Sequence, residues 1–190
     1  DDFTYTVKAR QYITHFIKLS DPEPPLHTLY NRVSVLGDTL GPILFQLPPN
    51  WRFNAERLAD FLDALNPEYR HAVELRDERW MTPRALTLLR KHEAAFCIYD
   101  VTGSLSPREV TAPFVYIRLH GPHADPYRGR YERSALAGWA GALSTWQRQG
   151  HEVFCFFDND EAGYAPKNAL ALQAMMRERT SYGSGTIGTP

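Results

Sequence analysis

The chain contains six short apolar runs, rich in β-branched and aromatic residues, and each run stops at charged or amide residues. Such runs are typical of buried strands, and they occupy residues 5–10, 43–48, 72–76, 96–100, 115–121 and 153–160. A buried strand gains nothing from ending in ionisable groups. In an α/β barrel, however, the carboxyl ends of the strands point into the site, so polar residues there have a chemical use. The pattern predicts where chemistry takes place and leaves the reaction open.

Between the runs, apolar residues recur every three or four positions, which is the spacing of one buried helix face. The first such pattern predicts a helix over Leu26–Leu40. Helix-start residues mark four more helices, at Asn54, Thr82 with Pro83, Ser134 (ending at Gly150) and Pro166. The connection from Asp100 to Phe114 is too short for a full helical crossover and contains Gly and Pro, so we expect a loop there.

Strands that alternate with helices predict parallel pairing and an α/β fold. A TIM-type (β/α)8 barrel spends roughly 31 residues on each unit, so about six units fill a chain of 190 residues. We therefore predict a partial barrel of about six strands whose first two units are absent. An open six-stranded sheet is the alternative. One domain is expected over residues 1–180, followed by a disordered tail over residues 181–190, which is rich in Gly, Ser and Thr.

Composition narrows the class of partner. The net charge of −1 and the absence of a Lys/Arg run argue against a nucleic-acid-binding protein. Neither a signal peptide nor a long apolar span is visible, and Cys97 and Cys155 lie inside predicted strands, so we expect a cytoplasmic protein without a membrane partner. The chain begins at Asp1 rather than Met, so its true start can lie upstream.

Strand side chains alternate in direction, and parity predicts which polar residues face the barrel axis. By this rule, five of the six strands each direct a polar group towards one common place. Asp100 is less clear, because it has the same parity as the apolar Ile98. The inward residues are Lys8, Arg10, Gln46, Glu74, Arg76, Arg118, His120 and Asp158. They predict a functional pocket, and the alternative is a buried ion network without a substrate.

The chemistry of these residues suggests an anion site with acid–base groups. Lys8, Arg10, Arg76 and Arg118 bring positive charge, and a helix that starts at Pro166 offers free N–H groups. The acid–base set comprises His15, Glu74, Asp100 and His120, of which we expect His120 and Glu74 to transfer the proton and Asp100 to assist. His15 is also counted among the ligand-binding residues, and the bland alternative for it is a loop or cap residue.

Aromatic residues and metal ligands are weaker signals. Trp80, Tyr99, Tyr116 and Tyr127 could stack on a sugar or base, although barrel aromatics more often belong to the core. Tyr127 lies in the loop His123–Tyr131, which could form a lid. A divalent metal is possible at strand ends rich in Glu, Asp and His, but no tight ligand signature occurs. No metal ligand is therefore named, and the cofactor stays unknown.

Several motifs resemble the DUF72 family, also called YecE-like proteins. The segments are Phe3–Arg10 with Thr14-His15, Leu36–Pro49, His71–Arg76 with Trp80, Tyr116–Gly121, and Phe156–Asp160 with Gly163–Ala169. The resemblance implies a TIM barrel, an absent N-terminal segment of roughly two strands with an "IGTSGW" motif, and no established activity. Its last motif contains Asn159 and Asn168, which complete the expected ligand-binding set. Asp158 departs from the family, which usually has Asn there, and this exchange could alter anion binding.

These observations predict an enzyme that acts on a small anionic molecule, phosphorylated or sugar-like, by acid–base or hydrolytic chemistry. Its class is open. The first alternative is a nucleic-acid-associated or other binding protein that uses the same basic residues. The second is an inactive chain, because the absent strands would normally contribute to the site.

Overall fold

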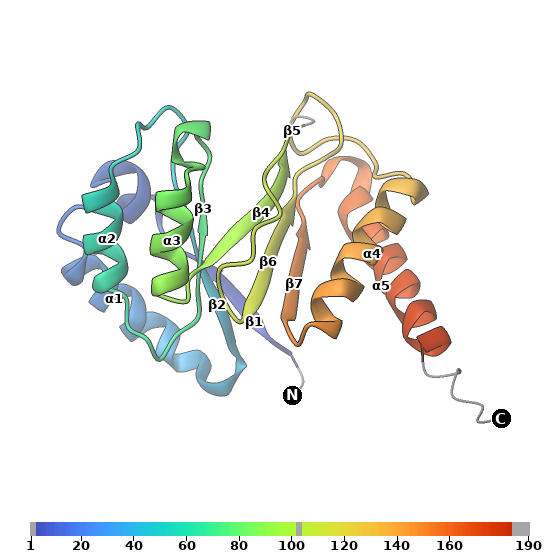
Figure 1. Ribbon diagram of the computed structural model, residues 1–190, viewed down its shortest axis with the longest axis horizontal. Helices are drawn as coiled ribbons and strands as arrows, with labels where there is room; N and C mark the ends of the chain where they lie inside the picture. The colour runs from blue at the N-terminus through green and yellow to red at the C-terminus, as the bar shows by residue number, and fades with distance from the viewer. Residues whose placement is uncertain (1–2, 102–103, 184–190) are drawn as a thin grey trace. The chain divides into compact units, whose positions relative to one another are not determined.

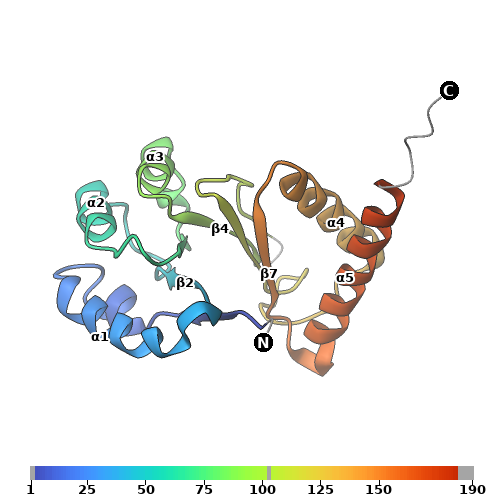
Figure 2. The same cartoon turned by 90° about the horizontal axis from the view of Figure 1, so that it is seen from below.

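The computed structural model describes residues 3–101 and 104–183, which divide into two compact units (Figures 1 and 2). The first unit runs to Cys97 and includes Pro107–Pro113. The second comprises Ile98–Ser106 and the chain from Phe114 onwards. Strand β4 (Ala95–Val101) belongs to both units, because its first three residues lie in the first and the rest in the second.

The first unit is built on parallel strands in the order β1-β2-β3-β4. Its strands are β1 (Tyr5–Lys8), β2 (Leu40–Gln46), β3 (His71–Glu74) and the start of β4. Its helices are η1 (Tyr12–Phe16), α1 (Glu23–Val33), η2 (Ser34–Thr39), α2 (Ala55–Asp63), η3 (Glu78–Trp80) and α3 (Pro83–Lys91). Helices α2 and α3 lie side by side in both views.

The core of the first unit forms where α2 packs on β2. Phe45 on β2 and Phe61 on α2 meet edge to face with their ring centroids 5.0 Å apart, and both are fully buried. Leu58 and Leu62 lie with Phe61 on the buried face of α2. Burial of each such side chain contributes roughly 1.5–3 kcal/mol, so this contact fixes the position of β2 and of the polar residue at its end.

The second unit orders its strands β4-β6-β7, with β5 attached to β4 as an antiparallel partner. It contains β5 (Ser104–Leu105), β6 (Phe114–Leu119), α4 (Arg133–Arg148), β7 (Glu152–Phe157), η4 (Glu161–Gly163) and α5 (Tyr164–Gly183). Strands β6 and β7 are parallel and paired along their whole length. Helices α4 and α5 pack beside one another in both views.

The expected alternation of strands and helices is confirmed, and so are two of the expected helix caps. The Asn54 side chain accepts a hydrogen bond from the N–H of Arg57 at 2.9 Å. The Thr82 hydroxyl accepts one from the N–H of Ala85 at 3.2 Å. Gly150 follows the end of α4 with a φ of 89°, as a helix-terminating glycine should.

Several expected boundaries are wrong, and the helices expected to start at Ser134 and Pro166 begin at Arg133 and Tyr164. The helix expected to reach Leu40 ends as α1 at Val33, because Gly37 adopts φ 49° and ψ −133° and Leu40 opens β2. The loop after Asp100 contains the short strand β5. Helix α5 continues through residues 181–183, which we expected to be disordered, since a nucleated helix extends at little cost. The remainder of the expected tail, residues 184–190, lies outside the described residues.

Candidate functional site

The carboxyl ends of β6 and β7 bring three ionisable side chains together in the second unit. Leu119 pairs with Phe157, and the N–H of Asp158 donates to the carbonyl of Leu119 at 2.8 Å. This register places Asp158 beside the end of β6. Its Oδ2 atom lies 2.7 Å from a terminal nitrogen of Arg118 and 3.1 Å from Nδ1 of His120.

The three side chains differ in access to solvent. The His120 side chain is 0% exposed, Arg118 is 12% exposed and Asp158 is 26% exposed. A ligand from solvent therefore meets Asp158 and Arg118 first. Parity predicted that Arg118 and His120 point to the same side of β6, and their shared contact with Asp158 confirms it.

Asp100 at the end of β4 belongs to a second group in this unit, with Tyr131 as its partner. The Tyr131 hydroxyl donates to Oδ2 of Asp100 at 3.1 Å and accepts from the N–H of Gly121 at 3.0 Å. Burial raises the pKa of Asp100, opposed by the Tyr131 hydrogen bond and by His120. Burial also raises the pKa of Tyr131, with the Asp100 charge as the next cause. The phenol therefore stays neutral and holds the carboxyl group in place.

Two asparagines fasten the segment 129–131 to the rest of the second unit. The Asn168 side chain accepts from the N–H of Tyr131 at 3.2 Å and donates to its carbonyl at 3.0 Å. Asn159 donates to Asn168 Oδ1 at 2.9 Å and to the carbonyl of Gly129 at 2.8 Å. Both amides are buried, so these expected ligand-binding residues hold a loop in this structure. Oδ1 of Asn159 has no hydrogen-bond partner among the described residues.

The loop that follows β6 returns over His120. The N–H of Tyr127 donates to the carbonyl of His120 at 2.6 Å, and the two rings meet edge to face with centroids 5.4 Å apart. Tyr127 has a φ of 66° and is 47% exposed. Gly121 permits this return, because a Cβ there would lie 2.2 Å from the carbonyl oxygen of Arg128. Tyr127 is thus placed where the sequence expected a lid, with one face towards solvent.

The strand ends of the first unit form a separate ion pair. Glu74 on β3 is fully buried, and its Oε1 accepts from Nε of Arg76. Its Oε2 lies 3.7 Å from the thiol of Cys97, which donates to it. Gln46 on β2 is in register with Glu74. The arrangement keeps the Glu74 carboxylate paired with a cation, and its expected role in proton transfer with His120 stays a prediction.

Trp80 occupies the position of a core residue in the first unit. It is 1% exposed, and its ring packs against Trp51 and Phe53 at centroid distances of 4.6 and 5.2 Å. Its indole N–H donates to the carbonyl of Trp51. The ring therefore serves the packing role that we weighed against stacking on a ligand.

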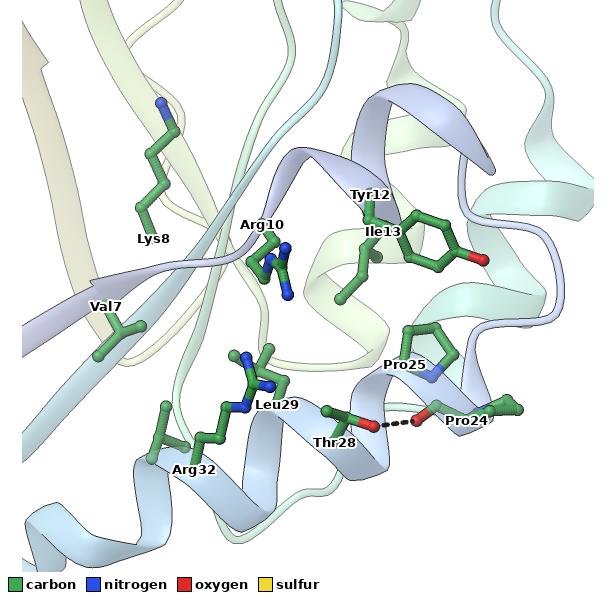
Figure 3. Close-up of a pocket in the computed structure, with 11 residues that line it drawn as sticks. Val7, Lys8, Arg10, Tyr12, Ile13, Pro24, Pro25, Thr28, Leu29 and Arg32 are labelled. Carbon is green, nitrogen blue, oxygen red and sulfur yellow. Dashed lines mark hydrogen bonds between the residues drawn. The ribbon is translucent and has the colours of Figure 1, made fainter.

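Lys8, Arg10 and His15 lie where β1 passes into η1. Burial lowers the pKa of His15, and the positive charge of Lys8 lowers it further. Lys8 and Arg10 line a cavity of about 570 Å³ between η1 and α1 (Figure 3). Parity places them on the same side, but in Figure 3 the Lys8 amine extends away from Arg10. The reason is that β1 ends at Lys8, so the alternation of a strand does not continue to Arg10.

The site has residues that sequence reasoning missed. Tyr131 carries no motif or spacing that marks it, because its partners lie far away in the sequence. Arg32 belongs to α1 and was counted only as part of a helix. The common rim that we expected for all strand ends stays a prediction, since the contacts found are those within each unit.

Two features are absent from the part of the chain that the structure describes, a metal-binding cluster and a membrane-spanning helix. Within residues 3–101 and 104–183, no three His, Cys, Asp or Glu side chains come together as a metal ion requires. None of the helices in this same part of the chain has the length and apolar character needed to cross a membrane.

Comparison with known proteins places the chain among proteins of unknown function. A family model described as "Protein of unknown function DUF72" matches residues 1–186. The chain is similar to a DUF72 family protein from Thermotoga maritima MSB8, with 26% identity, a TM-score of 0.79, and coverage of 95% of this chain and 74% of that one. A DUF72 family protein from Enterococcus faecalis V583 has a TM-score of 0.78 at 19% identity, over 92% of this chain and 74% of that one, and shows the fold alone. No curated protein matches the chain.

Proposed function

Since this chain belongs to the DUF72 family, a family of unknown function, we propose a function from the chemistry of its own residues. It binds a small anionic molecule at the carboxyl ends of β6 and β7 and transfers a proton there by acid–base chemistry. The observation that carries the proposal is the contact of one carboxylate oxygen of Asp158 with both Arg118 and His120, at 2.7 and 3.1 Å.

Arg118 supplies the binding step. Its guanidinium is a planar fork with five N–H donors, which matches the oxygens of a carboxylate or a phosphate. The group is mostly shielded from water, and a charge-assisted hydrogen bond gains strength in such surroundings. A bound anion competes with Asp158 for this fork, so Asp158 sets how tightly the site holds its ligand.

His120 and Asp158 supply the proton-transfer step. A carboxylate beside a histidine orients the ring and stabilises the imidazolium that forms when the ring takes up a proton. The other ring nitrogen then exchanges the proton with the substrate. Asp158 takes the part that the sequence suggested for Glu74, because it is the carboxylate next to His120 in the second unit.

Access to His120 requires the loop 121–131 to move. The histidine is fully buried, and the Tyr127 ring packs on it edge to face. Opening of this loop admits the ligand, and closure excludes water from the reacting groups. The hydrogen bonds of Asn159 and Asn168 end at residues 129–131, so they fix one end of the loop. Opening breaks the hydrogen bond from the Tyr127 N–H to the His120 carbonyl.

The proposal includes the wider fold. We place the strands in a TIM-type (β/α)8 barrel, in which the carboxyl ends of the strands carry the site. Support comes from parallel pairing within each unit and from relatives of which the chain spans about three quarters.

The binding step can be tested by titrating the protein with inorganic phosphate in a calorimeter. Arg118→Gln should weaken binding at least tenfold, whereas Arg148→Gln, an exposed arginine on α4, should leave it unchanged. Asp158→Asn should strengthen binding, because it removes the competing charge and keeps the shape. Equal phosphate affinity of the wild type and Arg118→Gln would overturn the proposed site.

The chemical step can be tested by screening turnover of a panel of phosphorylated sugars. His120→Gln should abolish any turnover found, while its midpoint of urea unfolding shows whether the fold survives. Turnover that persists in a folded His120→Gln protein would refute the acid–base assignment. Loss of folding would instead point to the buried ion network that the sequence left as an alternative.

A further inference from the structure

We infer that the first unit holds a second, separate anion site, in the cavity between η1 and α1, for a carboxylate or phosphate attached to an apolar body. The cavity measures about 570 Å³, within the range of roughly 300–1,000 Å³ that small-molecule sites occupy. All its lining residues lie between Val7 and Val33, within the first unit, whereas Arg118 belongs to the second unit.

Charge is the first argument for an anion. Three cationic residues line the cavity, Lys8, Arg10 and Arg32, and none of the eleven lining residues is acidic. Across residues 3–101 and 104–183, these three cations form no ion pair with a carboxylate. Two other arginines of the expected site differ: Arg118 already contacts Asp158, and Arg76 contacts Glu74.

The directions of the side chains narrow the position of the anion. Figure 3 shows Arg10 and Arg32 extending towards one another across the cavity, from the segment between β1 and η1 and from the last turn of α1. Two like charges that face the same space repel each other unless an anion lies between them. Two guanidinium forks on opposite sides can share the oxygens of one carboxylate or phosphate.

The rest of the cavity is apolar and calls for an apolar body on the ligand. Ile13 and Val33 are buried against it, and Leu29, Pro24 and Pro25 line its wall. The two prolines lack N–H groups, so the start of α1 offers the ligand no donors at these positions. Helix α1 rises about 12 Å from Pro24 to Arg32 at 1.5 Å per residue, which separates the apolar end of the cavity from the charged end.

The polar groups at the apolar end of the cavity do not alter the preference for an apolar body on the ligand. The Thr28 hydroxyl donates to the carbonyl of Pro24 at 3.1 Å, which satisfies it within the helix. Tyr12 is 55% exposed at the edge of the cavity and adds an aromatic face. The cavity therefore suits a ligand that is an amphipathic monoanion or dianion.

Calorimetric titration with four probes tests each part of this inference. Octanoate carries both the charge and the apolar body, octanol only the body, and acetate only the charge, while octyl phosphate distinguishes the two head groups. Octanoate, octyl phosphate or both should bind saturably, and octanol and acetate should each bind at least tenfold more weakly. The tighter of the two anionic probes identifies the head group.

Variants assign the binding to this cavity. Arg10→Gln and Arg32→Gln should each weaken binding of the tighter probe at least tenfold, whereas Arg84→Gln, on the exposed surface of α3, should not. Titration of both anionic probes in the Arg118→Gln background removes the contribution of the site in the second unit, so saturable binding that persists there belongs to this cavity. Absence of saturable binding of both anionic probes overturns the inference. The inference is also overturned if Arg32→Gln binds the tighter probe with unchanged affinity, or if octanol binds as tightly as octanoate.

Discussion

Replacement of Gly121 by alanine should displace the loop that covers His120. Gly121 has a φ of 117°, a conformation that costs a residue with a Cβ about 1–3 kcal/mol. The added Cβ would lie 2.2 Å from the carbonyl oxygen of Arg128, and this neighbour is backbone, so the loop itself must shift. Such a shift in a packed region costs roughly another 1–3 kcal/mol. We expect Gly121→Ala to lower the free energy of unfolding by about 2–6 kcal/mol.

The same chain provides a matched control. Gly138 lies inside α4, and a Cβ there would meet no atom within 4 Å. Gly138→Ala should raise the free energy of unfolding by up to about 1 kcal/mol, since alanine favours a helix over glycine. The two identical chemical changes should therefore have opposite signs.

Urea unfolding followed by circular dichroism measures both changes. Nuclear Overhauser contacts between the rings of Tyr127 and His120 report whether the loop has moved, because these rings meet at 5.4 Å in the wild type. A loss below about 1 kcal/mol in Gly121→Ala, with the ring contact intact, would refute the account of the loop.

Two further predictions concern buried polar groups, each measured by urea unfolding. Asn168→Ala removes three hydrogen bonds and should lower the free energy of unfolding by about 3 kcal/mol or more. The control Asn31→Ala, at an exposed position, should change it by less than about 0.5 kcal/mol. Similar losses in the two variants would contradict the role of Asn168. Burial lowers the pKa of His71 from 6.5 to about 4. The unfolded chain therefore binds a proton first as pH falls, and the first unit should lose about 3 kcal/mol between pH 6.5 and 4. His71→Gln should remove this loss and exposed His27→Gln should not; an unchanged pH profile in His71→Gln would exclude this cause.

Local signals in the sequence predicted the elements well. Each apolar run became a strand because β-branched and aromatic residues fit a buried pleated surface, and the strands of a parallel sheet are covered on both faces. The caps Asn54 and Thr82 act on N–H groups three residues away, so a short window of sequence contains all the information needed. Gly37 was misjudged because the spacing of leucines around it continues, although its backbone does not.

The candidate site was predictable only in part, for reasons of distance along the chain. Strand parity correctly placed Arg118 and His120 on one side, because alternation is a local property. The contact of Tyr131 with Asp100 spans 31 residues and that with Asn168 spans 37 residues. Such contacts depend on how loops pack and not on any periodicity. Asn159 and Asn168 were recognised as important, but their hydrogen bonds to the loop needed coordinates.

The two proposed anion sites differ in how their positive charge is balanced, and this difference has a consequence for binding. In the second unit, Asp158 already neutralises Arg118, so an anion gains only the difference between its own contacts and those it displaces. Such exchange favours weak binding and rapid release, as a reaction with turnover requires. In the first unit, Arg10 and Arg32 have no carboxylate partner among the described residues, and an anion there gains its full interaction. Both arginines are exposed, however, so water and salt screen them, and the apolar wall must supply much of the affinity. Binding in the first unit should therefore depend on the body of the ligand, and binding in the second on its charge.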